Sequence, residues 1–226
     1  MRAFFGLVPV LSVLAGASLL VDYKGGEATS TLGSCQLEGQ NLGDHISCPG
    51  NSSISIKPGQ DPSGKAALVY HRDAHFRRAE VKAGSDSMWE AEKEYYVGYN
   101  FMITNSRKSL VLYQWKRDDK SVVPADNIPF HLEFINDQLN LQVTTPGGSG
   151  SNRDTVAKAP VDVNKAHNIA LAFDTKMNGG DTASQNNRLA WWLDGKKIFD
   201  QAEYSLWSQK TGTYPKFGLY RGEDDG

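Results

Sequence analysis

Short apolar runs, each bounded by polar turn residues, follow one another along most of the chain. Val, Ile, Leu, Tyr, Phe and Trp dominate the runs, and Gly, Asp, Asn or Pro separates them, which is typical of β-strands. The pattern predicts roughly ten strands, at 66–71, 76–82, 95–103, 109–116, 130–137, 139–145, 167–175, 188–195, 196–200 and 217–222. Strands this short and numerous indicate an all-β sandwich, jelly roll or barrel.

The turn residues predict how some of these strands connect. Asp194-Gly195 is a two-residue hairpin signal between strand-like arms, and 136–138 predicts a second hairpin. Two longer polar segments, 144–155 and 174–187, are predicted as loops. Such loops either rim a functional face or are tolerated surface insertions.

The first residues differ from the rest of the chain. Arg2 precedes an apolar run that starts at Phe4, and the small triplet Ala15-Gly16-Ala17 follows. This order predicts a secretory signal peptide at 1–17, cut near Ala17, and a single secreted domain at 18–226. The alternative is a membrane anchor that extends to Val21.

The overall composition excludes several classes of protein. With 226 residues, 39% of them hydrophobic, and a formal net charge of -2, the chain suits one globular domain without a basic surface for nucleic acid. Apart from the first residues, no segment is long and apolar enough to cross a bilayer. Motifs for a metal centre and for a serine nucleophile are missing. The five histidines are scattered at His45, His71, His75, His131 and His167.

Two cysteines and a glycosylation signal lie close together near the N-terminus. In an oxidising compartment Cys35 and Cys48 would close a small disulfide loop. The sequon that begins at Asn51 would place this loop on the surface of a secreted glycoprotein.

Three predicted strands carry polar residues that alternate with apolar ones, so that the polar residues share a face. Taken singly, each has an ordinary explanation: an exposed salt-bridged strand, a satisfied core amide, or tyrosines on a half-buried strand. Only the combination indicates the polar wall of a cleft. The polar residues are Arg78, Glu80 and Lys82 on the first strand, Gln114 and Lys116 on the second, and Tyr214, Lys216 and Tyr220 on the third.

Strict alternation also makes predictions about the neighbours of these residues. On the second strand, Leu110 and Leu112 should share the face of Gln114, whereas Val111 and Tyr113 should point to the other side. On the third strand, the missing side chain of Gly218 should leave room for a ligand to approach the backbone.

Three motifs resemble those of known lyases. The motifs are R-A-E-V at 78–81, Q-W-K at 114–116 and Y-P-K-F-G-L-Y at 214–220, and they resemble the strand motifs of family 7 alginate lyases. The order of further segments over 69–223 is more similar to the secreted fungal glucuronan lyases of polysaccharide lyase family 20. The resemblance implies a concanavalin A-like β-jelly roll sandwich of two antiparallel sheets with a concave substrate cleft.

The resemblance also implies a function and roles for single residues. It implies a secreted, monomeric, endo-acting lyase that cleaves an acidic polysaccharide, β-1,4-glucuronan, without a cofactor for catalysis, and the fold is compatible with a structural Ca²⁺. Tyr220 matches the catalytic tyrosine. The substrate-binding positions are Gln114, Arg78, Glu80, Lys216, Lys116 and Tyr214.

The sequence departs from the family pattern at two points. Lys116 stands where alginate lyases have a histidine, so we expect His75 as the active-site histidine, with His71 as the alternative. Because simple alternation turns His75 away from Arg78, this choice requires a turn or bulge before the strand. Relatives continue past the last residues into a closing strand, so we expect a bare sheet edge in this chain.

The chemistry of β-elimination suits these residue types. A base must remove the proton at C5 of the uronate, and an acid must protonate the departing O4. Tyr220 could do both in turn if a cation helps its phenol, which normally titrates near ~10, and Lys216 is the expected cation. His75 as base with Tyr220 as acid is the competing assignment.

Two further hypotheses stay open. One is a lectin-like sandwich that binds carbohydrate without catalysis. The other is a glycoside hydrolase, which needs two carboxylates across a cleft, and here Glu80 has no evident partner in the sequence.

Overall fold

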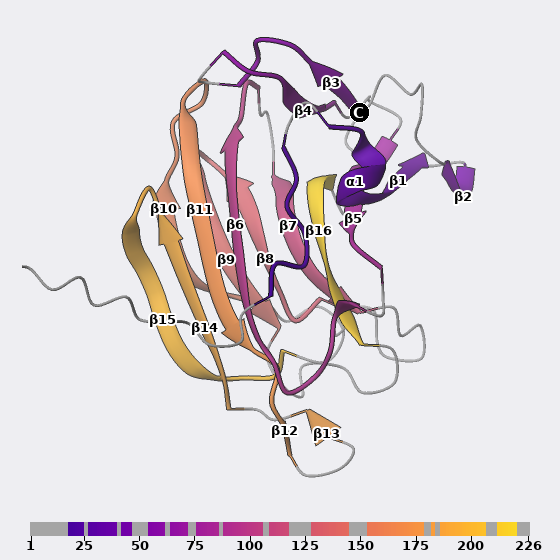
Figure 1. The fold of residues 1–226 in the computed structure, drawn as a ribbon. Coiled ribbons are helices and arrows are strands. Elements are labelled where there is room, and N and C mark those ends of the chain that lie inside the picture. The colour runs from indigo at the N-terminus through magenta and orange to yellow at the C-terminus, as the bar shows by residue number, and fades with distance from the viewer. Residues whose placement is uncertain are drawn as a thin grey trace, which may run out of the picture.

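Two antiparallel β-sheets pack face to face (Figure 1), and the main hydrophobic core of the described residues lies between them. They confirm the predicted all-β sandwich. The computed structural model describes residues 18–24, 27–39, 42–46, 54–61, 64–71, 76–85, 88–105, 109–117, 128–144, 153–178, 182–183, 186–206 and 212–220. The predicted signal peptide, Cys48, the sequon at Asn51 and the last six residues, 221–226, lie outside these ranges, so the predictions that rest on them stay predictions.

The larger sheet has eight strands in the order β10-β9-β8-β7-β16-β5-β1-β2. The last strand of the described residues, β16, thus lies between two strands from the first half of the chain, β5 and β7. The strands are β1 (Gly33–Gly39), β2 (Leu42–Ile46), β5 (Phe76–Ala83), β7 (Leu110–Arg117), β8 (Phe130–Ile135), β9 (Gln138–Thr144), β10 (Arg153–Pro160) and β16 (Thr213–Tyr220).

The second sheet has four strands in the order β15-β14-β11-β6. Its strands are β6 (Glu94–Met102), β11 (Ala166–Asp174), β14 (Asn187–Leu193) and β15 (Lys196–Tyr204). The remaining elements are the pairs β3 (Ile54–Lys57) with β4 (Ala67–Tyr70) and β12 (Met177–Asn178) with β13 (Thr182–Ala183), and the short helix α1 (Thr29–Leu32). No helix in the described ranges could span a membrane.

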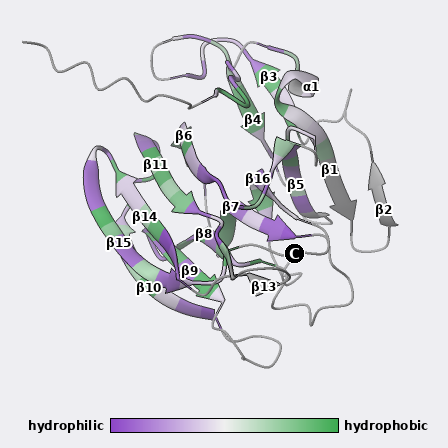
Figure 2. Cartoon of the chain, turned by 60° about the horizontal axis from the view of Figure 1, so that its bottom comes forward, coloured by the Kyte–Doolittle hydropathy of each residue, from purple (hydrophilic) through white to green (hydrophobic). Residues whose placement is uncertain are grey.

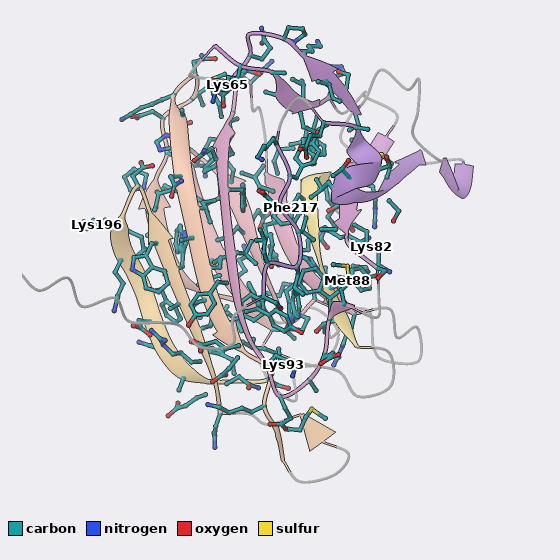
Figure 3. All side chains as sticks on the ribbon, viewed as in Figure 1. Lys65, Lys82, Met88, Lys93, Lys196 and Phe217 are labelled. Carbon is teal, nitrogen blue, oxygen red and sulfur yellow. The ribbon has the colours of Figure 1, made fainter. Side chains whose placement is uncertain are left out.

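Aromatic rings fill the space between the sheets. Trp115 of β7 and Phe130 of β8 contact Phe173 of the opposite sheet, with ring centroids 4.7 and 5.1 Å apart. Figure 3 shows Phe217 in this interior, and polar and apolar bands alternate along β15 in Figure 2. The alternation predicted from the sequence therefore decides which side chains enter the core.

Both predicted hairpins are present, and their backbone angles explain the residues found there. Asp194 and Gly195 have φ values of 50° and 76° between β14 and β15. Asn136 and Asp137 have φ values of 50° and 57° between β8 and β9. Two positive φ angles in a two-residue turn define the type I′ geometry, which Asn, Asp and Gly tolerate best.

Several strands lie where the sequence pattern does not predict a strand. Residues 33–39 form β1 and pair with β5, although Gly, Ser and Cys suggested a loop. Arg153 begins β10 inside the segment predicted as a polar loop, and the second predicted loop contains the two short strands β12 and β13. These sequences lack a clear apolar alternation, and pairing with a neighbouring strand makes them extended.

A bulge in β7 corrects the predicted facing of its first residues. Val111 pairs with Glu133 and Tyr113 pairs with Leu132, so β7 has one extra residue between them. As a result Leu110 and Leu112 contact the core, while Val111 turns to the outer face. The prediction for these residues was wrong because a bulge breaks the period of two on which it rested.

The structure explains the glycine at position 218 by close packing of the protein, and not by the approach of a ligand that the sequence predicted. It is buried at a φ of 141°, and a Cβ built there would lie 2.3 Å from the carbonyl oxygen of Ala79 and 3.0 Å from the ring of Tyr70. The missing side chain therefore allows β5 to approach β16, and the space predicted for a ligand is filled by protein.

Strand β6 forms one edge of the four-stranded sheet, and within the described ranges it pairs only with β11. A hollow of about 1580 Å³ adjoins this edge, between β6, β4 and the inner side of β16. Residues 18–21 and Tyr23 line it, and Leu20 and Val21 pack on the core there. The hollow therefore lies between the layers, on the opposite side of β16 from the polar residues.

Candidate active site

The outer face of the eight-stranded sheet collects the polar residues of six strands, and we call it the polar face. The strand pairings align these residues in rows that run across the sheet. One row is Arg78, Tyr220, Val111, Glu133 and Asn140. The next is Lys82, Lys216, Gln114, His131 and Gln142. The third is Tyr214 with Lys116, and Thr144 with Arg153.

Glu80 is the centre of a buried group on the polar face. Gln114 Nε2 donates a hydrogen bond of 2.5 Å to Glu80 Oε1. Arg78 and Lys216 bring their cationic nitrogens to 3.4 and 4.0 Å from Glu80 Oε2. Glu80, Gln114 and Lys216 are each only 1% exposed. The Glu80 carboxylate therefore links its own strand, β5, to Gln114 of β7 and Lys216 of β16.

Burial and the neighbouring charges shift the pKa of the Glu80 carboxyl in opposite directions. Burial raises the pKa of the Glu80 carboxyl, and the ammonium of Lys216 and the guanidinium of Arg78 oppose that rise. Lys216 therefore serves this carboxylate, whereas the sequence suggested that its charge would act on Tyr220. The arrangement orients Arg78, whose side chain is 12% exposed and reaches the surface.

Tyr220 lies beside that arginine. The two residues pair across β16 and β5, and the guanidinium carbon of Arg78 is 4.9 Å from the centroid of the Tyr220 ring. Tyr220 is only partly buried, so a ligand on the polar face can reach it. The predicted tyrosine and arginine are therefore brought together at an accessible place.

Tyr214 and Lys116 occupy the end of the site near the start of β16. Tyr214 is 2% exposed, and the ammonium of Lys82 lies 3.7 Å from the centroid of its ring. Lys116 pairs with Tyr214 and is partly buried. A cation at this distance from an aromatic face is attracted to it, so Tyr214 holds Lys82 in place from below.

A second polar group lies across the sheet, and the sequence did not single it out. Gln142 donates a hydrogen bond of 2.7 Å to Glu133 Oε2, and His131 Nε2 lies 3.6 Å from the same oxygen. His131 and Glu133 alternate with apolar residues along 130–134, which is the signal that could have revealed them.

His131 is expected to make folding stability depend on pH. Burial lowers its pKa, and Glu133 opposes this effect. As the pH falls below ~6.5 the unfolded chain binds this proton first, so stability is lost by up to about 1.4 kcal/mol per pH unit. Urea unfolding between pH 7 and pH 5.5 should therefore show a smaller loss in His131→Gln than in the parent. Equal losses in the two proteins would contradict this role.

The structure does not decide between the two candidate active-site histidines. His75 lies outside the described residues, and His71 is exposed just after β4. The choice between these two histidines stays a prediction. In the described part of the chain, no group of three His, Cys, Asp or Glu side chains could hold a metal ion. The structural Ca²⁺ therefore stays a prediction without an assigned site.

Comparisons with known proteins agree with this geometry. The polysaccharide lyase family model matches residues 29–226. The chain belongs to the polysaccharide lyase family. No curated protein sequence matches this lyase.

Solved structures with the same fold include two kinds of lyase. The endo-β-1,4-glucuronan lyase of Trichoderma reesei is 16% identical, with a TM-score of 0.55 over 83% of each chain. A family 7 alginate lyase in complex with its product is 13% identical, with a TM-score of 0.56 over 89% of this chain and 91% of that one. At these identities the similarity establishes the jelly-roll fold, as the sequence motifs implied.

Proposed function

We propose that this polysaccharide lyase is a secreted monomer that cleaves β-1,4-glucuronan within the chain by β-elimination. The observation that carries the proposal is the contact between Arg78 and Tyr220, 4.9 Å from guanidinium carbon to ring centroid, on an accessible polar face. A phenol next to a fixed cation provides a proton-transfer group and a carboxylate-binding group at one place. The solved glucuronan lyase with the same fold makes this substrate the first choice.

The charge of the polar face supports an acidic substrate. The whole chain has a net charge of -2, yet cations outnumber carboxylates among the described residues of this face. A locally positive surface on a near-neutral protein attracts polyanions and raises their local concentration. The cations with described side chains are Arg78, Lys82, Lys116, Lys216, Arg153 and Lys158, and the carboxylates with described side chains are Glu80 and Glu133.

The proposed reaction needs three groups and balances without water. Arg78 binds the C6 carboxylate of one sugar and stabilises the negative charge that develops when the C5 proton leaves. A base, either the Tyr220 phenolate oxygen or His75, takes that proton. The C5–H electrons form the C4–C5 double bond, the C4–O4 bond breaks, and Tyr220 in its protonated form gives a proton to O4.

Burial argues against the glycoside hydrolase alternative. Glu80 is 1% exposed and is held by Gln114, Arg78 and Lys216, so it does not present an acid to a sugar. An inverting or retaining hydrolase needs two carboxyl groups that both reach the glycosidic bond.

A panel of polyuronates tests the proposed function. The protein is incubated separately with glucuronan and with alginate, and products are followed by ultraviolet absorbance and mass. Elimination is expected to give unsaturated oligomers from glucuronan that lack one water relative to hydrolysis products. Binding without chain shortening would favour the lectin-like alternative, and saturated products would show hydrolysis. Faster cleavage of alginate would overturn the choice of substrate but not the reaction.

A further inference from the structure

Arg153 is a cation on the polar face that the proposed reaction does not use. It begins β10 and pairs with Thr144 of β9, whose neighbour Val143 points into the core. Alternation therefore turns Arg153 outward, to the side of Gln142 and Glu133. In the sheet order β10 lies three strands beyond β7, so Arg153 approaches the site from the side opposite Arg78.

Two groups of the site act electrostatically on the Arg153 guanidinium. Burial lowers its pKa, and the Tyr220 phenol and the Glu133 carboxylate oppose that effect. Its Nε atom is buried and has no hydrogen-bond partner in the described part of the protein. Because the residue as a whole is only partly buried, its other N–H groups can bind an anionic ligand on the polar face.

Val111 separates the two arginine positions. The bulge in β7 places it in one row between Tyr220 and Glu133, with Arg78 beyond Tyr220. Val111 is only 7% exposed, so it fills the space between these polar groups. Along the sheet order one arginine lies on each side of it.

We propose that Arg153 binds the carboxylate of the uronate next to the one that Arg78 holds, so that the two arginines span the bond to be cleaved. The inference rests on the proposed function. A polyuronate has one carboxylate on every sugar. A cation beside each bound sugar therefore strengthens the binding of the polymer. Glu133, held by Gln142 and close to His131, interacts favourably with the charge of Arg153.

Binding to a catalytically silenced protein tests the proposal. Calorimetry compares a glucuronate hexamer on three proteins: Tyr220→Phe, Tyr220→Phe with Arg153→Gln, and Tyr220→Phe with Lys196→Gln. Loss of a charge-assisted hydrogen bond should weaken binding about 10- to 100-fold in the second protein. Lys196→Gln removes the same charge from an exposed residue of β15, far from Lys82 and β5 in Figure 3, and should change binding less than about twofold.

Two controls separate this inference from the function on which it rests. Arg153→Lys keeps the charge but not the planar pair of donors, so it should weaken binding less than Arg153→Gln and still raise KM. Unsaturated product from the wild type, together with unchanged binding in both Arg153 variants, would overturn the role of Arg153 alone. Absence of any unsaturated product from the wild type would overturn the proposed function and this inference with it.

Discussion

Replacing Tyr220 with Phe is expected to lower the rate of unsaturated product formation by about a hundred- to ten-thousand-fold, the usual contribution of a proton-transfer group. The change removes only the phenolic oxygen. The ring remains beside Arg78, whose guanidinium carbon lies 4.9 Å from its centroid, so the cation should keep its place. Steady-state absorbance with glucuronan measures the rate, and calorimetry with a glucuronate oligomer measures binding.

The control for this variant is Tyr96→Phe, because Tyr96 is 66% exposed on β6 of the opposite sheet. It should retain the parental rate. Binding by Tyr220→Phe should stay within a few-fold of the parent, since Arg78 and the other cations are unchanged. A fully active Tyr220→Phe would show that another group transfers the proton, and the assignment to Tyr220 would then be wrong.

Replacing Glu80 with Gln is expected to destabilise the fold by about 3–5 kcal/mol, the cost of breaking a buried ion pair from one side. Glu80 is 1% exposed, and its carboxylate lies 3.4 Å from Arg78 and 4.0 Å from Lys216. The neutral amide keeps the size of the side chain but leaves both cations without their counter-charge. Urea unfolding at pH 7 measures the free energy, and the slope of the transition shows whether unfolding remains two-state.

A second substitution tests whether the loss comes from the uncompensated charge. Adding Lys216→Met removes the other fully buried ion, so the double variant should recover part of the stability that Glu80→Gln loses. The matched control is Glu94→Gln at an exposed position of β6, which should change stability by less than about 0.5 kcal/mol. An equally small change in Glu80→Gln would contradict a structural role for this carboxylate.

Part of the candidate site follows from local alternation, and part does not. Arg78, Glu80, Gln114 and Lys216 alternate with buried residues, so a period of two assigns them to one face from sequence alone. Arg153 follows a run of Gly, Ser and Asn and has no apolar alternation before it. Its strand exists because β9 offers it a pairing edge, and no local pattern contains that information.

The bulge in β7 shows the same limit at the scale of one residue. Val111 faces outward because an extra residue sits opposite a single position of β8. Nothing in the run Leu-Val-Leu-Tyr marks where that extra residue lies, because each of these side chains is compatible with burial.

The all-β class, the two hairpins and the family motifs follow from the amino-acid sequence alone, because each depends on residues that are close together in the chain. The order of the strands, and therefore which polar residues meet, follows only from the folded chain. The fold places β16 between β5 and β7, pairs Lys216 with Glu80, and sets Arg153 within electrostatic range of Tyr220. The physical reason is that hydrogen bonding between strands and burial of charge depend on partners far away in the sequence.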